Sequence, residues 1–389
     1  MNFAFTPEQE RFRREVLQFL TDEITPELRQ AIDAGADGGY YNKEFSRKVG
    51  ARGWIGLSWP KDWGGQGIGH MERLIYYEEM TRAQAPWGYH FFAERQMGPS
   101  IIMHGTDQQR RDLIPAIVRG ELSFCIGYSE PGAGSDLAGL QTSATADGDD
   151  FVINGQKMYT SGAHTANYMW LAARTNPAAP KHKGISMFLV EMDTPGVTVR
   201  PLPTMESGRL NEVFFDNARV PSSSMVGELN QGWYVVAANL DFERSGLERI
   251  IANERVFERF LEQVRANDDP TLRVADNSVA RHRLAEIALE LRLGRLLAYR
   301  VAWLQSRGEV PNYEASVTKL FGGEMNQRAS AGILSMLGLS GGRAGDALDT
   351  PLGGRALRWY LGSISNTIAG GSSEVLRNII ATRGLGLPR

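Results

Sequence analysis

The chain has 389 residues, 42% of them hydrophobic and 22% charged, which is enough for a large apolar core and about two or three globular domains. Its 42 lysines and arginines nearly balance its 45 aspartates and glutamates, and a net charge of −3 excludes the basic surface of a nucleic-acid or anionic-membrane binder. The single cysteine, Cys125, excludes an intrachain disulfide framework and favours a reducing, cytoplasmic location.

The first block, residues 1–120, is predicted to be mostly helical. It shows neither the basic nor the apolar region of a signal peptide, and no run of about 18 apolar residues predicts a membrane span anywhere in the chain. A capping box joins Thr6 to Gln9, and Pro7 takes the first helical position. The apolar residues that follow have helical spacing: Phe12, Val16, Phe19 and Leu20.

The second block, residues 121–230, changes to short apolar runs bounded by Gly, Pro, Asn and Asp, which predict strands at 168–173, 185–190 and 212–215. A hairpin turn at 147–150 leads into a further strand. The third block, residues 231–389, returns to helices. Its first helical stretch, from 231 to about 266, carries an apolar face formed by Val235, Leu240, Leu247, Ile251, Phe260 and Val264.

The most informative segment is the octapeptide Ser-Glu-Pro-Gly-Ala-Gly-Ser-Asp at 129–136. Gly132 and Gly134 have no Cβ, so the backbone N–H groups of this turn can approach a phosphate or a ring edge, and Ser129 and Ser135 add hydroxyl donors. A plain turn closing a strand is the alternative. We expect the segment Asn-Gly-Gln-Lys-Met-Tyr-Thr-Ser-Gly at 154–162 to lie on a neighbouring strand.

Other motifs carry no chemistry. The Gly-Leu-Ser-Gly-Gly sequence at 338–342 matches a nucleophile elbow, but the residues before it look helical and no histidine follows Ser340, so we exclude a hydrolase. The glycines at 65–69 lack the preceding strand of a dinucleotide-binding fingerprint. None of the six histidines pairs with another at metal-ligand spacing, so no metal site is predicted.

Taken together, segments 129–136 and 154–161 resemble the acyl-CoA dehydrogenase family, whose flavin is held by a Thr/Ser-Glu-Pro-x-x-Gly-Ser-Asp turn and an Asn-Gly-x-Lys-x-Trp-x-Thr strand. The resemblance covers essentially the whole chain. It implies an α+β multidomain fold with an N-terminal all-α domain (1–120), a middle β-barrel or β-sandwich domain (121–230) and a C-terminal four-helix-bundle domain (231–389). It also implies FAD, an acyl-CoA substrate and electron transfer to an electron-transfer flavoprotein.

The resemblance assigns cofactor contacts residue by residue. In the first turn it assigns Ser129, Gly134 and Ser135. In the second segment Ser161 matches the threonine near the flavin N5, and Tyr159 replaces the tryptophan. Near the C-terminus Ser372 matches the threonine of a Gly-Thr pair, and Glu374 the residue near the adenosine. Of the residues that reach a neighbouring subunit's FAD in related homotetramers, only Arg273 is matched here, and Ser335 stands where a glutamine is usual. Backbone N–H groups near Gly338 and Gly341 offer the pyrophosphate an alternative contact without those side chains.

A flavin dehydrogenase needs a carboxylate base at the substrate α-carbon while hydride leaves the β-carbon. Most family members carry this glutamate before the Gly-Thr pair, where this chain has Gly370. In the isovaleryl and long-chain branches it lies on the first long helix after the β-domain, directly before an arginine, and this implies Glu243 as the base, followed by Arg244. A solvated helix glutamate is the alternative for Glu243. The base is expected in a desolvated pocket with a raised pKa.

Substrate contacts implied by the same resemblance are Ser135, Glu243, Arg244, Gly370 and Gly371. The weak match at the FAD-reaching positions implies either a homotetramer or a heterotetramer with a related subunit. An oxidase or monooxygenase of the same fold, and a partner subunit without turnover, remain open. The acyl group cannot be read from the residues.

Overall fold

The computed structural model describes residues 4–33, 37–243, 247–266, 277–343 and 351–388. Its N-terminal part is helical: α1 (Pro7–Glu23), α2 (Pro26–Asp33), α3 (Asp37–Tyr40), α4 (Lys43–Ala51), α5 (His70–Arg82), α6 (Gly88–Phe92), α7 (Gly98–His104) and α8 (Asp107–Val118). The predicted capping box is confirmed, because Thr6 Oγ1 accepts from Gln9 N at 3.2 Å and Gln9 Oε1 from Thr6 N at 3.0 Å. A π-helical segment, Ala93–Met97, connects α6 to α7.

The middle part is a β-sheet, as predicted. Its strands are β1 (Phe124–Gly127), β2 (Ser143–Asp147), β3 (Asp150–Lys157), β4 (Tyr168–Arg174), β5 (Ile185–Glu191), β6 (Val197–Pro203), β7 (Arg209–Pro221) and β8 (Met225–Val226). Among the described residues the sheet order is β6-β7-β3-β2-β4-β5-β8, and β1 pairs with β4 in parallel. The predicted hairpin is confirmed, since Asp147 pairs with Asp150 and Gly148 has a φ of 64°.

One expectation about this sheet is wrong. We expected segments 129–136 and 154–162 on neighbouring strands, but β1, which precedes the first segment, pairs with β4, whereas β3 lies between β2 and β7. The two segments still meet, because Met158 N donates to Ser129 O at 2.9 Å. A loop contact rather than a strand ladder therefore brings them together.

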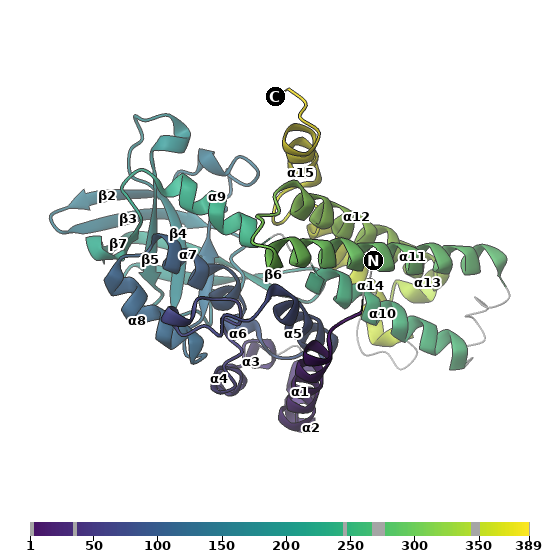
Figure 1. The fold of residues 1–389 in the computed structure, drawn as a ribbon. Helices are drawn as coiled ribbons and strands as arrows, with labels where there is room; N and C mark the ends of the chain where they lie inside the picture. Colours follow the sequence, from purple (N-terminus) through teal and green to yellow (C-terminus); the bar gives the residue numbers. More distant parts are fainter. Residues whose placement is uncertain (1–3, 34–36, 244–246, 267–276, 344–350, 389) are drawn as a thin grey trace.

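The C-terminal part is helical again: α9 (Gly232–Glu243), α10 (Leu247–Ala266), α11 (Ser278–Ser306), α12 (Tyr313–Met336), α13 (Gly338–Gly341), α14 (Arg355–Ser365) and α15 (Ser373–Ile379). The predicted stretch 231–266 is described as two helices. Figure 1 shows α9 beside the sheet, whereas α10, α11, α12 and α14 form a separate helical group. None of the helices in the described ranges is long and apolar enough to cross a membrane.

Candidate functional site

The turn at 129–136 directly follows β1 and opens toward solvent. Glu130 and Ala133 close it through two backbone hydrogen bonds, at 2.9 and 3.1 Å. Gly134 and Ser135 are exposed, and a Cβ added at Gly134 would meet no atom within 4 Å. The backbone here is therefore free to approach a ligand, as the glycine pattern predicts.

A buried ion pair fixes this turn from below. The Lys157 side chain is fully buried at the end of β3, and its Nζ donates to Glu130 Oε1 at 2.7 Å and to Tyr128 O at 3.1 Å. The Glu130 carboxylate also accepts the backbone N–H groups of Gln141 at 2.6 Å and Thr142 at 2.9 Å. The pair and the Met158–Ser129 hydrogen bond hold the two motif segments in one arrangement.

Burial and pairing act in opposite directions on these two groups. Burial lowers the pKa of the Lys157 ammonium to about 8, against the raising effect of Glu130. Burial works to raise the pKa of Glu130, but the Lys157 charge and the hydrogen bonds bring it below its usual value. Glu130 is therefore an ionised buried carboxylate at neutral pH.

Our sequence reasoning missed this pair, although a signal was present. Along β3 the buried residues alternate, with Phe151, Ile153 and Lys157 on the core side. A lysine at a core-facing position requires a buried acceptor, and the only acid within the first motif besides the terminal Asp136 is Glu130.

The end of the second segment presents unused polar and aromatic groups. Tyr159 has a φ of 59°, a conformation that few bulky residues adopt, and its side chain is 57% exposed. Thr160 is buried, and its Oγ1 makes no hydrogen bond among the described residues. Ser161 is half-buried. The exposed Tyr159 ring and the half-buried Ser161 hydroxyl are the groups of this segment that a flat ligand with polar edges could reach.

A second candidate region is the turn at 370–374, where α15 begins. Gly370 and Gly371 have φ values of 67° and 98°, and Ser372 caps α15 by accepting from Val375 N at 3.4 Å. The buried Lys319 of α12 donates to Gly371 O at 2.6 Å and to Asn366 O at 3.0 Å. This lysine fixes the turn against α12.

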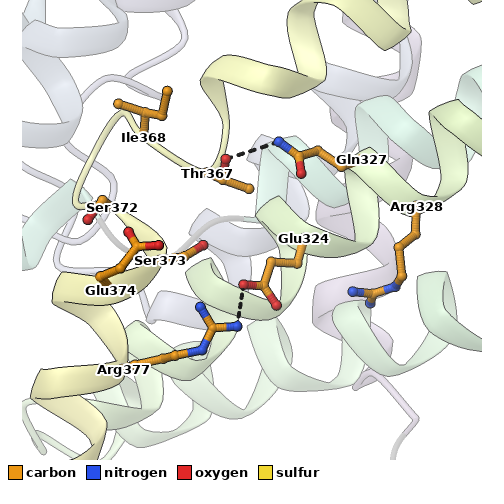
Figure 2. Close-up of a pocket in the computed structure, with 9 residues that line it drawn as sticks. All are labelled: Glu324, Gln327, Arg328, Thr367, Ile368, Ser372, Ser373, Glu374 and Arg377. Carbon is orange, nitrogen blue, oxygen red and sulfur yellow. Dashed lines mark hydrogen bonds and ion pairs between the residues drawn. The ribbon is translucent and has the colours of Figure 1, made fainter.

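A cavity of about 440 Å³ opens beside this turn (Figure 2). Arg377 Nη2 donates to Glu324 Oε1 at 2.6 Å, and Gln327 Nε2 donates to Thr367 Oγ1 at 3.0 Å. Two residues with an implied cofactor role line this cavity, so the structure brings Ser372 and Glu374 together at a polar hollow. The lining residues are Glu324, Gln327, Arg328, Thr367, Ile368, Ser372, Ser373, Glu374 and Arg377.

Gly338 and Gly341 lie away from that cavity. They form α13 beyond the end of α12, and a rise of about 1.5 Å per residue places them roughly 20 Å along α12 from Glu324. Gly338 is exposed, whereas Gly341 packs against Leu337. Within one chain the structure therefore does not bring these glycines to the Ser372 turn.

The remaining implied residues fall partly outside the described residues. α9 ends at Glu243, whose side chain is outside the described part of the chain, as are Arg244 and Arg273. The expectation that Glu243 is desolvated, and the roles implied for the two arginines, stay predictions.

The described residues fit FAD. An isoalloxazine ring has hydrogen-bonding edges and a flat face, which suit the half-buried Ser161 hydroxyl and the exposed Tyr159 ring. The open Gly134 backbone and the polar cavity beside Ser372 suit the phosphates and the adenosine.

Three family models match the chain. They are described as the acyl-CoA dehydrogenase N-terminal domain, which matches residues 6–121, the middle domain, which matches 125–218, and the C-terminal domain, which matches 230–385. Among curated proteins, the chain is similar to acyl-CoA dehydrogenase FadE26 of Mycobacterium tuberculosis, with 37% identity over 404 aligned residues, covering 100% of this chain and 99% of the relative.

Among the similar solved structures are two that match the chain over 100% of both lengths. One is the Tcur3481-Tcur3483 steroid ACAD, with a TM-score of 0.90 at 35% identity. The other is the ChsE4-ChsE5 complex from Mycobacterium tuberculosis, with a TM-score of 0.89 at 37% identity. The arrangement of helical, β-sheet and helical domains predicted from the sequence is confirmed by these matches.

Proposed function

The chain belongs to the acyl-CoA dehydrogenase family and is an oxidoreductase of that family, and we propose that it desaturates an acyl-CoA thioester between its α and β carbons with FAD. The observation that carries the proposal is the turn at 129–136, locked by Lys157 and Glu130 yet open at Gly134 and Ser135. When bound, FAD accepts the hydride from the β-carbon.

In this proposal the chain's own residues bind the flavin, orient the acyl-CoA and remove its α-proton. The hydroxyls of Ser129, Ser135 and Ser161 donate hydrogen bonds to the flavin. Backbone N–H groups at Gly370 and Gly371 polarise the thioester carbonyl and so stabilise the α-carbanion. Ser372 and Glu374 hold the adenosine end in the cavity of Figure 2.

Glu243 takes the α-proton. The position where most family members carry the catalytic glutamate supports this assignment. Here it is Gly370, which like Gly371 has the left-handed backbone that favours glycine, so no carboxylate is present at that position. Glu243 ends α9, directly before Arg244, in the pattern of the isovaleryl and long-chain branches. Arg244 supports the substrate beside it.

For the substrate and the partners we propose a bulky, steroid-type acyl-CoA, an electron-transfer flavoprotein as acceptor, and a heterotetramer with a related subunit. The two similar solved structures, one a steroid ACAD and the other a two-protein complex, support the steroid-type acyl group and the hetero-oligomeric assembly. An apolar stripe on α11 supports an oligomer, since four large side chains on it are about half exposed or more: Leu289, Leu293, Leu296 and Trp303. A cytoplasmic location remains a prediction from the single cysteine.

The test is Glu243→Gln, which keeps the side-chain shape but cannot accept the proton. We expect the variant to retain FAD and bind acyl-CoA, while anaerobic flavin bleaching by a panel of steroid-type and fatty acyl-CoAs slows by about three orders of magnitude or more. Glu258→Gln is the matched control, because Glu258 is half-exposed on α10 and pairs with Arg82. Bleaching of Glu243→Gln at the wild-type rate would contradict the proposed base.

A further inference from the structure

Among the side chains of helix α9 that the structure describes, residues 232–239, Asn239 is a fully buried polar one, and the buried Val235 and Val236 beside it are apolar. Its Nδ2 donates to Ser100 Oγ at 3.0 Å and to Gln96 O at 3.4 Å. Its Oδ1 accepts from the Tyr128 hydroxyl at 3.2 Å. Both ends of this amide are therefore hydrogen-bonded inside the protein.

The partners of Asn239 come from three different segments. Ser100 lies on α7, Gln96 lies in the π-helical segment before it, and Tyr128 follows β1. Asn239 thus ties α9 to the N-terminal helices and to the β-sheet at one point. Such directional bonds fix the rotation and the height of a helix, whereas contacts between valines tolerate sliding.

Tyr128 extends the same chain of hydrogen bonds to the flavin turn. Its hydroxyl also accepts from Trp170 Nε1 at 3.0 Å, and its carbonyl accepts from Lys157 Nζ at 3.1 Å. Lys157 in turn holds Glu130. Because Ser129 is the next residue along the chain, Tyr128 anchors both the start of the flavin turn and helix α9.

We propose that Asn239 is a positioning residue that sets α9, and so the position of Glu243 four residues further on, relative to the turn at 129–136. The proposal rests on the proposed function, in which Glu243 is the base. Four residues are about one helical turn, so a shift or rotation of α9 at Asn239 moves the backbone at position 243 by a similar amount. Displacements of about 1 Å at a reacting group cost about a hundredfold in rate.

Asn239→Leu tests this, because it keeps the number and branching of the side-chain heavy atoms and removes all three hydrogen bonds. We expect the limiting rate of anaerobic flavin bleaching at saturating acyl-CoA to fall by about 10- to 100-fold. FAD content and the half-saturating acyl-CoA concentration stay within about twofold, because neither binding site is touched. A lower melting temperature with an unchanged limiting rate would show that Asn239 only stabilises the fold and would overturn the proposal.

Tyr128→Phe provides a second, milder variant that removes a single hydroxyl, and it carries the test if Asn239→Leu does not fold. Tyr234→Phe is its matched control, since it makes the same change on α9 at a side chain that is 63% exposed. We expect the limiting rate to fall in Tyr128→Phe and to stay at the wild-type value in Tyr234→Phe. Equal limiting rates in the wild type, Tyr128→Phe and Tyr234→Phe would overturn the proposal.

A double variant sharpens the test. Tyr128→Phe combined with Asn239→Leu loses the hydrogen bond that the two side chains share only once, so the fall in its limiting rate should be smaller than the product of the two single falls. Multiplied effects would contradict a shared link. The outcome is separable from the proposed function: slow bleaching in Glu243→Gln together with wild-type rates in the Asn239 and Tyr128 variants would refute only the positioning role.

Discussion

Replacing Lys157 with methionine should destabilise the protein and weaken its hold on FAD. Methionine fills nearly the same volume but removes the ammonium that sits 2.7 Å from Glu130 Oε1 and 3.1 Å from Tyr128 O. Glu130 is 7% exposed, so its carboxylate would remain buried without its cation.

The expected loss in the free energy of unfolding depends on the hydrogen bonds that Glu130 retains in the variant. Removing one partner of a buried ion pair costs about 3–5 kcal/mol. Because the backbone N–H groups of Gln141 and Thr142 still donate to the carboxylate, we expect the lower end, about 3 kcal/mol at neutral pH. Without Lys157, burial raises the pKa of Glu130, so the carboxyl takes a proton in the folded state in acid. The deficit relative to wild type should therefore shrink as the pH falls from 7 toward the usual value of 4.5, because the variant's buried carboxyl is neutralised over that range.

Urea unfolding at pH 7 and at pH 4.5, with FAD affinity measured by fluorescence, checks this. Lys181→Met is the matched control, since Lys181 pairs with Asp136 at 2.8 Å in the same turn, but both side chains are about half exposed or more. An exposed pair contributes at most about 1 kcal/mol. The double variant Lys157→Met with Glu130→Gln should recover part of the loss. If Lys157→Met and Lys181→Met unfold at the same urea concentration, the reasoning is refuted.

Three further outcomes are expected. Burial lowers the pKa of His90 to about 4, so between pH 6.5 and 4 the unfolded chain binds a proton that the folded one does not. The neutral buried His90 therefore contributes about 3 kcal/mol to the free energy of unfolding above pH 6.5, and this contribution is lost as the pH falls to 4. The free energy of unfolding of His90→Gln should depend less on pH in this window, and an equally steep loss would contradict the reasoning. Turnover should be much faster with ferrocenium than in air, because the enoyl product shields the reduced flavin from oxygen, and stoichiometric peroxide at a comparable rate would indicate an oxidase. Native mass spectrometry of the isolated chain should show less than one FAD per subunit, since Ser335 replaces a side chain that related homotetramers use on the neighbouring FAD; a fully loaded, fully active homotetramer would exclude the heterotetramer.

Features that depend on a few adjacent residues could be predicted from the sequence alone. The Thr6 capping box and the hairpin at Gly148 require only the chemistry of neighbouring side chains and a residue that accepts a positive φ. The same holds for the open turn at Gly134. The family could be predicted because its two motifs are contiguous strings in the chain.

The pairing of segments that are distant in sequence was decided only by the tertiary structure. The residues of β1 alone do not determine that it pairs with β4 rather than with β3, because strand pairing depends on which apolar faces meet in the core. The same limit hid the Lys157–Glu130 pair, the hold of Lys319 on the Gly371 turn, and the Asn239–Tyr128 contact. Each contact joins residues at least 27 positions apart in the sequence. A polar group needs such a partner only once folding has buried it, and the identity of the partner depends on which segments the fold brings together.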